Sequence, residues 1–319
     1  MTQNPPRRLR VLTWHVHGNY LYYLTQAQHE FHIVTRPGFP PGYAGAAGAL
    51  PWGSNLYEVR AEDVALHEFD VILYQHRHHW DNDRLTLLTD TQRRLPRVYI
   101  EHDPPQHQPF EQRHWVQDAD TLIVHVTHFN QLMWDCGSTP TRVIEHGVLV
   151  PRNVRYSGEL GRGVVVINNL SKRGRRLGSD VYADVRAQLP LDLVGINAEV
   201  VGGLGEIPNP ALAAFCARYR FFFNPIRWTS LGLAIVEAMT IGMPIVGLAT
   251  TELATVIRNG ESGYIDTNVD TLVDAMRNLL DDPVEARRLG EGARRIAIER
   301  FGIERFAHEW TETLNAVAR

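Results

Sequence analysis

The sequence has little of several features that mark specialised classes of protein. It has only two cysteines, Cys136 and Cys216, which lie far apart and form no metal-type spacing with other Cys or with His, so we expect a reducing cytoplasm. It has no apolar run near the roughly 20 residues of a membrane span. The first ten residues are followed by no apolar stretch long enough for a signal peptide. We therefore expect a cytoplasmic protein without a transmembrane segment, and peripheral membrane contact stays open.

An excess of charge is also missing. The chain carries 32 Lys and Arg against 36 Asp and Glu, a formal net charge of -4, which argues against a nucleic-acid partner bound through bulk charge. With 319 residues, 44% hydrophobic and 21% charged, the composition is that of a soluble protein long enough for two core-forming domains. The loop 38–48 is rich in Gly, Pro and Ala, and we expect it to be mobile.

Strand-like and helix-like segments alternate along the chain, which indicates an α/β fold. In the first half we expect strands at 9–15, 29–35, 69–75, 98–101, 122–126 and 142–144, and helices at 20–26, 83–94 and 130–134. A polar stretch at 152–163 is interpreted as an interdomain linker. In the second half we expect strands at 164–167, 191–195 and 221–224, and helices at 180–188, 211–218, 272–280, 286–299 and 304–317.

Glu237 is the only charged residue between Arg227 and Glu252. The pattern predicts that it lies in a mostly apolar helix at 231–241, preceded by a Thr-Ser cap and followed by a buried strand at 244–248. Because burying an unpartnered carboxylate costs several kcal/mol, Glu237 needs hydrogen-bond donors. The residues alone leave two sources open, which are donors within the protein and a ligand diol such as a nucleotide ribose.

This segment resembles the donor-binding signature of the family 4, or group 1, retaining glycosyltransferases. In that signature two Glu residues flank a Gly-x-Gly-Leu turn and the helix that follows. The matching residues are Gly232-Leu233, Glu237-Ala238-Met239, Gly242, Pro244 and Val246, and downstream Thr251-Glu252, Val256-Ile257, Asn259-Gly260 and Gly263-Tyr264. Two positions depart from the family, because the first Glu falls on Thr229 and Leu231 replaces the usual aromatic residue.

The resemblance implies a GT-B fold, with two facing Rossmann-like domains and a deep cleft between them. We expect an acceptor-side domain at 1–151, a nucleotide-sugar-binding domain at 152–302, and a final helix at 303–319 that packs back on the first domain. Ligands of open α/β sheets bind at the carboxyl ends of the strands, so the chemistry is expected in the loops there.

The basic loop at 168–176 follows a predicted strand directly and suits a pyrophosphate. The family has an Arg and a Lys-Gly at this turn, and they contact the donor phosphates. Here Asn169 takes the place of the Arg, and Lys172 or Arg173 precedes Gly174. Which basic residue from Lys172 to Arg176 reaches the phosphates stays open, as does a merely solvated basic turn.

Two turns of the first half are candidates for the same site. Gly18, in the loop after the first strand, would let backbone amides approach a phosphate, or it is simply a turn glycine. His102 follows the strand at 98–101 and resembles the family histidine that lies beside the transferring sugar; the alternative is a structural histidine. The turn Glu145-His146-Gly147-Val148 resembles the Asn-Gly-Val turn that ends the family's first domain.

The histidines of the first half, among them His15, His17, His76, His78 and His79, raise the question of a zinc site. No His-Glu-x-x-His motif and no Cys companion accompanies them, and the family reaction needs no metal. We therefore expect no metal and no cofactor.

Together these features predict a metal-independent, retaining glycosyltransferase that moves a sugar from a nucleotide-diphosphate sugar to a hydroxyl of a glycan, glycolipid or small molecule. The resemblance assigns the catalytic roles to His102, Lys172 and Arg173, and donor binding to Gly18, Asn169, Arg175, Thr229, Ser230, Leu231, Gly232, Leu233 and Glu237. A sugar-nucleotide epimerase, a phosphorylase and a non-catalytic partner of another transferase remain alternatives. The last is raised by Thr229 and Asn169. The sequence leaves the sugar, the base, the acceptor and the linkage open.

Overall fold

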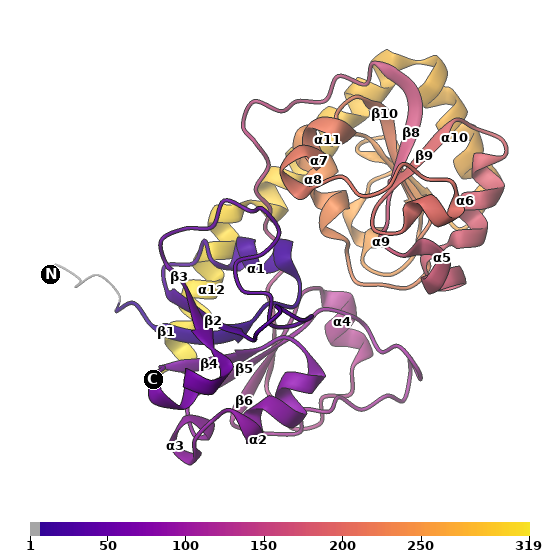
Figure 1. Cartoon of the computed structure of the whole chain (residues 1–319). Coiled ribbons are helices and arrows are strands. Elements are labelled where there is room, and N and C mark those ends of the chain that lie inside the picture. Colours follow the sequence, from indigo (N-terminus) through magenta and orange to yellow (C-terminus); the bar gives the residue numbers. More distant parts are fainter. Residues whose placement is uncertain (1–6) are drawn as a thin grey trace, which may run out of the picture. The chain divides into compact units, whose positions relative to one another are not determined.

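The computed structural model of the protein describes residues 7–319, which fold into two compact units (Figure 1). The first unit extends to Gly147 and includes Ile303–Arg319, and the second is Val148–Gly302. Both units are α/β, as predicted, and every strand pairing between neighbours is parallel. The predicted facing of the two domains stays a prediction. Within residues 7–319, no helix is long and apolar enough to cross a membrane.

The first unit contains a seven-stranded sheet in the order β3-β2-β1-β4-β5-β6-β7. Its strands are β1 Arg10–Trp14, β2 Glu30–Thr35, β3 Leu56–Arg60, β4 Val71–Tyr74, β5 Arg97–Glu101, β6 Thr121–His125 and β7 Thr141–Val143. Its helices are α1 Gly18–Leu24, η1 Ala61–Leu66, η2 His79–Asp83, α2 Arg84–Thr86, α3 Asp90–Arg93, α4 His128–Met133 and α12 Ile303–Val317. All four residues of β4 are buried, as expected of a parallel strand covered on both faces.

The last helix, α12, belongs to the first unit although the second unit separates it from the rest in sequence (Figure 1). Its buried face carries Phe306 and Trp310, and Phe306 packs edge to face against Tyr20 of α1. A Cβ on Gly147 would lie 2.3 Å from the Cβ of Phe306, so only glycine fits at this position beside α12. Arg305 of α12 also donates to the backbone carbonyls of Glu145 and His146.

The second unit contains a five-stranded sheet in the order β12-β11-β10-β8-β9. Its strands are β8 Leu160–Val166, β9 Leu191–Val194, β10 Tyr219–Asn224, β11 Ile245–Leu248 and β12 Gly263–Asp266. Its helices are α5 Leu170–Arg173, η3 Gly174–Leu177, α6 Ser179–Arg186, η4 Ala198–Val201, α7 Asn209–Cys216, α8 Leu233–Ile241, α9 Leu253–Val256, α10 Val269–Asp281 and α11 Pro283–Phe301. Phe221 and Phe223 of β10 pack in its core with residues of the neighbouring strands and of α10.

Several local predictions were wrong. The stretch at 152–163 is not a free linker, because β8 already begins at Leu160, and Tyr156 and Ser157 donate backbone hydrogen bonds to Ile241 and Ala217 of the second unit. The single helix predicted at 83–94 is instead broken into η2, α2 and α3, since Thr89 and Gln92 form a capping box that starts a new helix. The predicted Thr-Ser cap is absent: α8 begins at Leu233 with Gly232 as its N-cap and no side-chain cap.

Candidate functional site

The basic turn directly follows β8 of the second unit. Asn169 adopts the left-handed conformation with φ +55° at the start of α5. Its side-chain oxygen accepts a hydrogen bond from Asn197 Nδ2 at 2.7 Å, and its backbone N–H donates to the carbonyl of Ile196 at 2.7 Å. Asn169 therefore ties the loop after β8 to the loop after β9, and it supplies no charge where the family has an Arg.

Lys172 and Arg173 lie on the exposed surface of α5. Lys172 is the only lysine of the chain, which otherwise relies on arginine for its positive charge. In the part of the chain that the structure describes, Lys172 makes no ion pair. A compact ammonium group is thus available at the position where the resemblance expects a phosphate contact.

The basic turn is joined to the loop that carries Thr229. Arg227 donates to both carboxylate oxygens of Asp180 on α6, at 2.6 and 2.8 Å, and also to the carbonyl of Arg175 at 2.8 Å. The backbone N–H groups of Arg227 and Trp228 both donate to the carbonyl of Arg176, at 3.1 and 3.2 Å. The Arg227 guanidinium holds the pKa of the Asp180 carboxyl down at about 2, so this pair is ionised at neutral pH.

Arg175, which was predicted to bind the donor, is exposed and also pairs with Asp180. This contact places its guanidinium in the junction between the two loops. Lys172, by contrast, forms no ion pair with the residues that the structure describes, and it lies exposed on the preceding helix α5.

Gly178 makes the same junction possible. It adopts φ +77°, and a Cβ at this position would lie 1.9 Å from the carbonyl oxygen of Pro225. Pro225 directly follows β10, so the start of α6 packs against the loop that leads to Thr229 with no room for a side chain. The structure therefore brings together two segments that are distant in sequence and that the resemblance assigns to phosphate and to sugar.

The junction lies where ligands bind in this type of sheet. The order β9-β8-β10-β11-β12 reverses direction between β8 and β10, and ligands of doubly wound sheets bind at the carboxyl ends of the strands at such a reversal. The basic turn follows β8, and the Thr229 loop follows β10. Both flank the reversal.

The residues from Thr229 to Leu233 lead into α8. Ser230 and Leu231 are buried, Thr229 is partly buried, and Gly232 is the N-cap in extended conformation. No side chain caps α8 and no acidic residue lies in its first turn. The N-terminal amides of this helix thus meet no protein carboxylate of their own first turn, an arrangement that suits an anion.

Glu237 is buried in α8, as predicted, with 5% of its surface exposed. It borders a small cavity of about 10 Å³ together with Cys216 and Ala213 of α7 and Val166 of β8. Burial and the neighbouring Glu237 charge raise the pKa of the Cys216 thiol to about 12. This contact could not be predicted from the sequence, because Cys216 belongs to no motif.

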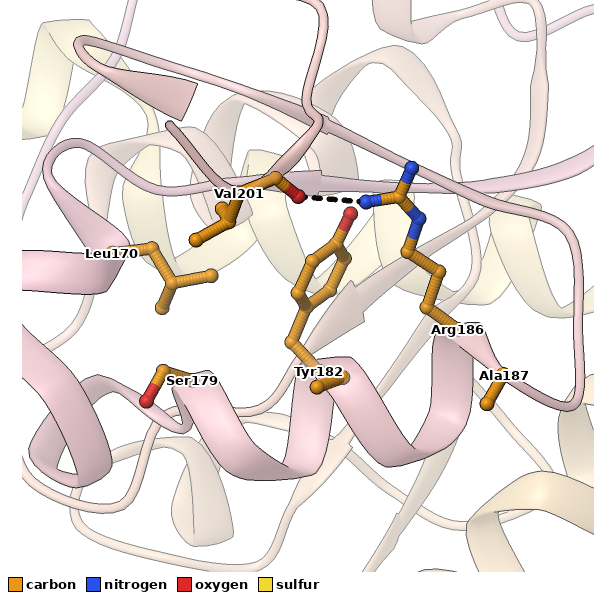
Figure 2. Close-up of a pocket in the computed structure, with 7 residues that line it drawn as sticks. Leu170, Ser179, Tyr182, Arg186, Ala187 and Val201 are labelled. Carbon is orange, nitrogen blue, oxygen red and sulfur yellow. Dashed lines mark hydrogen bonds between the residues drawn. The ribbon is translucent and has the colours of Figure 1, made fainter. Parts of the chain in front are cut away.

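A larger pocket of the second unit lies apart from these residues. It has a volume of about 370 Å³ and lies between α6, η4 and Leu170 (Figure 2). Figure 2 shows the ring of Tyr182 in its wall beside Arg186, which donates to the carbonyl of Val201 at 2.8 Å. None of the predicted donor-binding residues lines this pocket, so it is not part of the candidate site.

In the first unit, the turn after β1 is organised around a histidine. Gly18 is the first residue of α1, and a Cβ on it would lie 2.9 Å from Nε2 of His15. The Nδ1 atom of His15 lies 2.5 Å from the carbonyl oxygen of Gly45. The glycine therefore makes room for a histidine that holds the Gly-rich loop at 38–48, and a phosphate contact of Gly18 stays a prediction.

His102 directly follows β5 and is partly buried. Its ring lies 4.2 Å from that of His17 and 4.7 Å from that of Tyr20, centroid to centroid. Its Nε2 atom lies 3.2 Å from Oε1 of Gln75, the residue that follows β4. His102 thus lies next to the point where the order of this sheet reverses, between β1 and β4.

A buried pair that the sequence analysis missed supports the loop after β5. Nε2 of His114 lies 3.0 Å from Oε2 of Glu101, and the backbone N–H of Val116 donates to Nδ1 of His114 at 3.0 Å. Burial lowers the pKa of His114 to about 4, so the imidazole is neutral and its proton is on Nε2. The other oxygen of Glu101 accepts from the backbone of Asp103, which fixes the residue after His102.

His76, His78 and His79 lie together, with the rings of His76 and His78 at 5.7 and 5.9 Å from that of His79, centroid to centroid. His79 is buried against Trp14, with ring centroids 5.0 Å apart, and burial lowers its pKa to about 3. Among residues 7–319, no three side chains of His, Cys, Asp or Glu come together as a set that could hold a metal ion. Metal-free chemistry stays a prediction.

Comparison with known proteins agrees with these features. A family model described as Glycosyl transferases group 1 matches residues 178–282. The D-inositol 3-phosphate glycosyltransferase of Nocardioides sp. is 30% identical over 139 residues, which are 43% of this chain and 30% of that protein, so the match spans less than a third of that relative.

Two solved structures share the fold over nearly the whole chain. Sucrose-phosphate synthase from Thermosynechococcus elongatus has a TM-score of 0.72 and 17% identity, covering 96% of this chain and 98% of that one. The Anabaena protein Alr3699/HepE, solved in complex with UDP-glucose, has a TM-score of 0.71 and 14% identity, covering 97% of this chain and 100% of that one. Residues 178–282 therefore match the model of the group 1 glycosyl transferases, within a chain that shares its α/β fold with these two solved structures.

Proposed function

We propose that the protein is a glycosyltransferase that moves a sugar from a nucleotide-diphosphate sugar to a hydroxyl of a glycan, glycolipid or small-molecule acceptor. The observation that carries the proposal is the junction at the β8/β10 reversal. There the turn with the only lysine of the chain is tied to the loop that leads into the uncapped helix α8. A basic turn tied to a loop that leads into free helix amides is an arrangement suited to a diphosphate.

A uridine diphosphate sugar is the first donor to test, because the Anabaena neighbour was solved with UDP-glucose. In the proposed complex Lys172 and Arg173 contact the diphosphate, and Glu237 accepts hydrogen bonds from the ribose hydroxyls. The sugar then lies near Thr229, Ser230 and the amides at the start of α8. We propose that no metal and no cofactor takes part.

The proposed reaction is a substitution on one face of the sugar. The bond between the anomeric carbon and the phosphate oxygen breaks, and the diphosphate leaves with the electron pair, stabilised by Lys172, Arg173 and the α8 amides. The acceptor oxygen forms its bond on the same face, so the configuration is retained, and its proton passes to the leaving phosphate oxygen. This reaction needs no carboxylate nucleophile of the protein.

One observation keeps a second function in consideration, which is that of a non-catalytic partner that binds the donor. Thr229 offers a neutral hydroxyl where the family has a carboxylate. The side chain of Asn169 is bound to Asn197 and adds no charge. Two contacts of the family's donor site are therefore weaker here.

Nucleoside diphosphate release separates the two functions. The protein is incubated with UDP-, GDP- and dTDP-sugars, with and without a crude glycolipid or oligosaccharide fraction. The proposed transferase releases nucleoside diphosphate only when acceptor is present. Donor binding without release under any acceptor condition supports the partner function. Release by the Thr229→Glu variant but not by the wild type would then identify the carboxylate at this position as the missing group.

Replacing Glu237 by Gln should lower donor affinity about tenfold or more, because a charge-assisted hydrogen bond contributes roughly 1.5 to 3 kcal/mol. The fold should persist, since the amide keeps the shape of the carboxylate. Calorimetry with the nucleotide sugar measures the change.

Asp192→Asn is the matched control, because Asp192 is a partly buried carboxylate of the second unit that lies outside the signature and pairs with Arg162 at 2.7 Å. This variant should lose stability but keep its donor affinity. Equal donor affinity in wild type and Glu237→Gln would remove Glu237 from the site.

A further inference from the structure

Gln75 connects three strands of the first unit at the point where the order of its sheet reverses. Its side chain is buried, and its Nε2 atom donates to Oγ1 of Thr13 at 3.1 Å and to the carbonyl oxygen of Trp14 at 3.2 Å. Thr13 and Trp14 belong to β1, and Gln75 directly follows β4. Its Oε1 atom lies 3.2 Å from Nε2 of His102, which follows β5. One amide thus joins the ends of β1, β4 and β5.

These contacts determine where the proton of His102 lies. The carbonyl of Trp14 can only accept a hydrogen bond, so the amide nitrogen of Gln75 faces β1. The amide oxygen therefore faces His102, and it too can only accept. Nε2 of His102 is then the donor and carries the proton, which leaves the lone pair of a neutral imidazole on Nδ1.

Nδ1 is the second hydrogen-bonding atom of the His102 ring. Among the described residues it has no hydrogen-bond partner, and it is not one of the polar atoms sealed from solvent. The pKa of His102 lies well below its usual value because of burial and because of the nearby His17 and His146. The ring is therefore neutral at physiological pH.

We propose that Gln75 is a positioning residue that holds the proton of His102 on Nε2, so that Nδ1 accepts a hydrogen bond from a hydroxyl of a bound ligand. The inference rests on the proposed function for the identity of the ligand, but the position of the proton is a property of the free protein. A charged imidazolium or the other tautomer would turn Nδ1 into a donor.

Nitrogen NMR of the histidines in the free protein tests the first half of the inference. We expect the wild type to give the signals of the Nε2-protonated tautomer for His102, assigned by comparison with His102→Gln. In Gln75→Leu the preference should be lost. In Gln75→Glu the carboxylate should stabilise the imidazolium and raise the pKa of His102.

The matched control is Gln92→Leu. Gln92 is also a buried glutamine of the first unit, and it donates to the carbonyls of Val64 and His67 at 2.8 Å. This variant should lose stability without changing the signals of His102. A dominant Nδ1-protonated tautomer in the wild type, or an unchanged tautomer in Gln75→Leu, would overturn the inference.

Turnover measurements test the second half of the inference, which is that Nδ1 of His102 accepts a hydrogen bond from a ligand. Gln75→Leu should lower kcat/KM about tenfold, the worth of one hydrogen bond held in place. In Gln75→Glu, activity should fall below the raised pKa of His102 and recover above it. The wild type should show no loss from this group between about pH 6.5 and 8, which lies above the usual pKa of histidine.

Other titratable groups lie around His102 and can also contribute to the pH dependence of activity. They are His17 and Tyr20 at α1, His146 after β7, and the neighbouring Glu101 and Asp103. A profile of Gln75→Glu that matches the wild type would overturn the role of Gln75 in turnover. If the wild type releases no nucleoside diphosphate from any donor, the proposed function fails, and the NMR result on the free protein decides alone whether Gln75 sets the proton.

Discussion

Gly178→Ala should destabilise the second unit by about 3 kcal/mol or more, a loss typical of a collision that the fold cannot relieve. The new Cβ would lie 1.9 Å from the carbonyl oxygen of Pro225 and 2.7 Å from its carbonyl carbon, and both are backbone atoms that cannot rotate away. The left-handed backbone at φ +77° adds strain. Because the basic turn would then separate from the loop that carries Thr229, affinity for nucleotide should fall together with stability.

Hydrogen exchange of the β8 and β10 amides, followed by mass spectrometry, measures this loss within the second unit. Gly260→Ala is the matched control, since Gly260 has φ +75° in the same unit but nothing lies within 4 Å of its added Cβ. The control should cost only the strain of the left-handed conformation, roughly 1 to 2 kcal/mol. Equal protection in the two variants would mean that the contact between Gly178 and Pro225 does not hold the junction.

The double change Lys172→Ala and Arg173→Ala should weaken binding of nucleoside diphosphate and of nucleotide sugar about 100-fold, because each lost charge-assisted contact is worth roughly 1.5 kcal/mol or more. Binding of the nucleoside alone should change little, since it has no phosphate. Affinity of the wild type for the diphosphate should also decline with added salt. Calorimetry at two salt concentrations measures both effects.

Arg162→Ala with Arg218→Ala is the matched control, because it removes the same charge from the second unit. These arginines pair with Asp192 and Glu159, and they lie toward the amino ends of β8 and β10. The control should bind diphosphate like the wild type. Equal losses for nucleoside and diphosphate in the Lys172/Arg173 variant would contradict the assignment of the phosphates to this turn.

The elements that carry a local pattern could be predicted from the sequence. Glu237 was expected in an apolar helix because no other charge surrounds it, and the structure buries it there. The basic turn was expected after a strand because charged residues directly follow the apolar run of β8. Each of these two signals is contained in one short stretch of the sequence.

The junction between the two loops could not be predicted in this way. Asp180 and Arg227 are 47 residues apart, and each belongs to a stretch where an exposed charge is ordinary. Their pairing follows from the strand order, which places β10 beside β8. Gln75 and His102 are likewise 27 residues apart and meet only because β4 and β5 are neighbours.

The strand β3 was missed for a different reason. Only Val59 of its five residues is buried, since β3 lies at the edge of the sheet, so it has no apolar run. The departures from the family at Thr229 and Asn169 were visible in the sequence. The contact that the Asn169 side chain makes instead was not visible there, because its hydrogen bond with Asn197 depends on the conformation of two loops.

Sugar transfer with retention of configuration is the central proposal, and the anomeric carbon reports on it directly. A nucleotide sugar labelled with ¹³C at that carbon is incubated with the protein and an acceptor fraction, and the one-bond carbon–proton coupling of the product is read by NMR. The account predicts a new glycoside with the configuration of the donor, formed together with nucleoside diphosphate and absent for the Lys172/Arg173 variant. An inverted glycoside, or a donor that stays intact with every acceptor fraction, would contradict it.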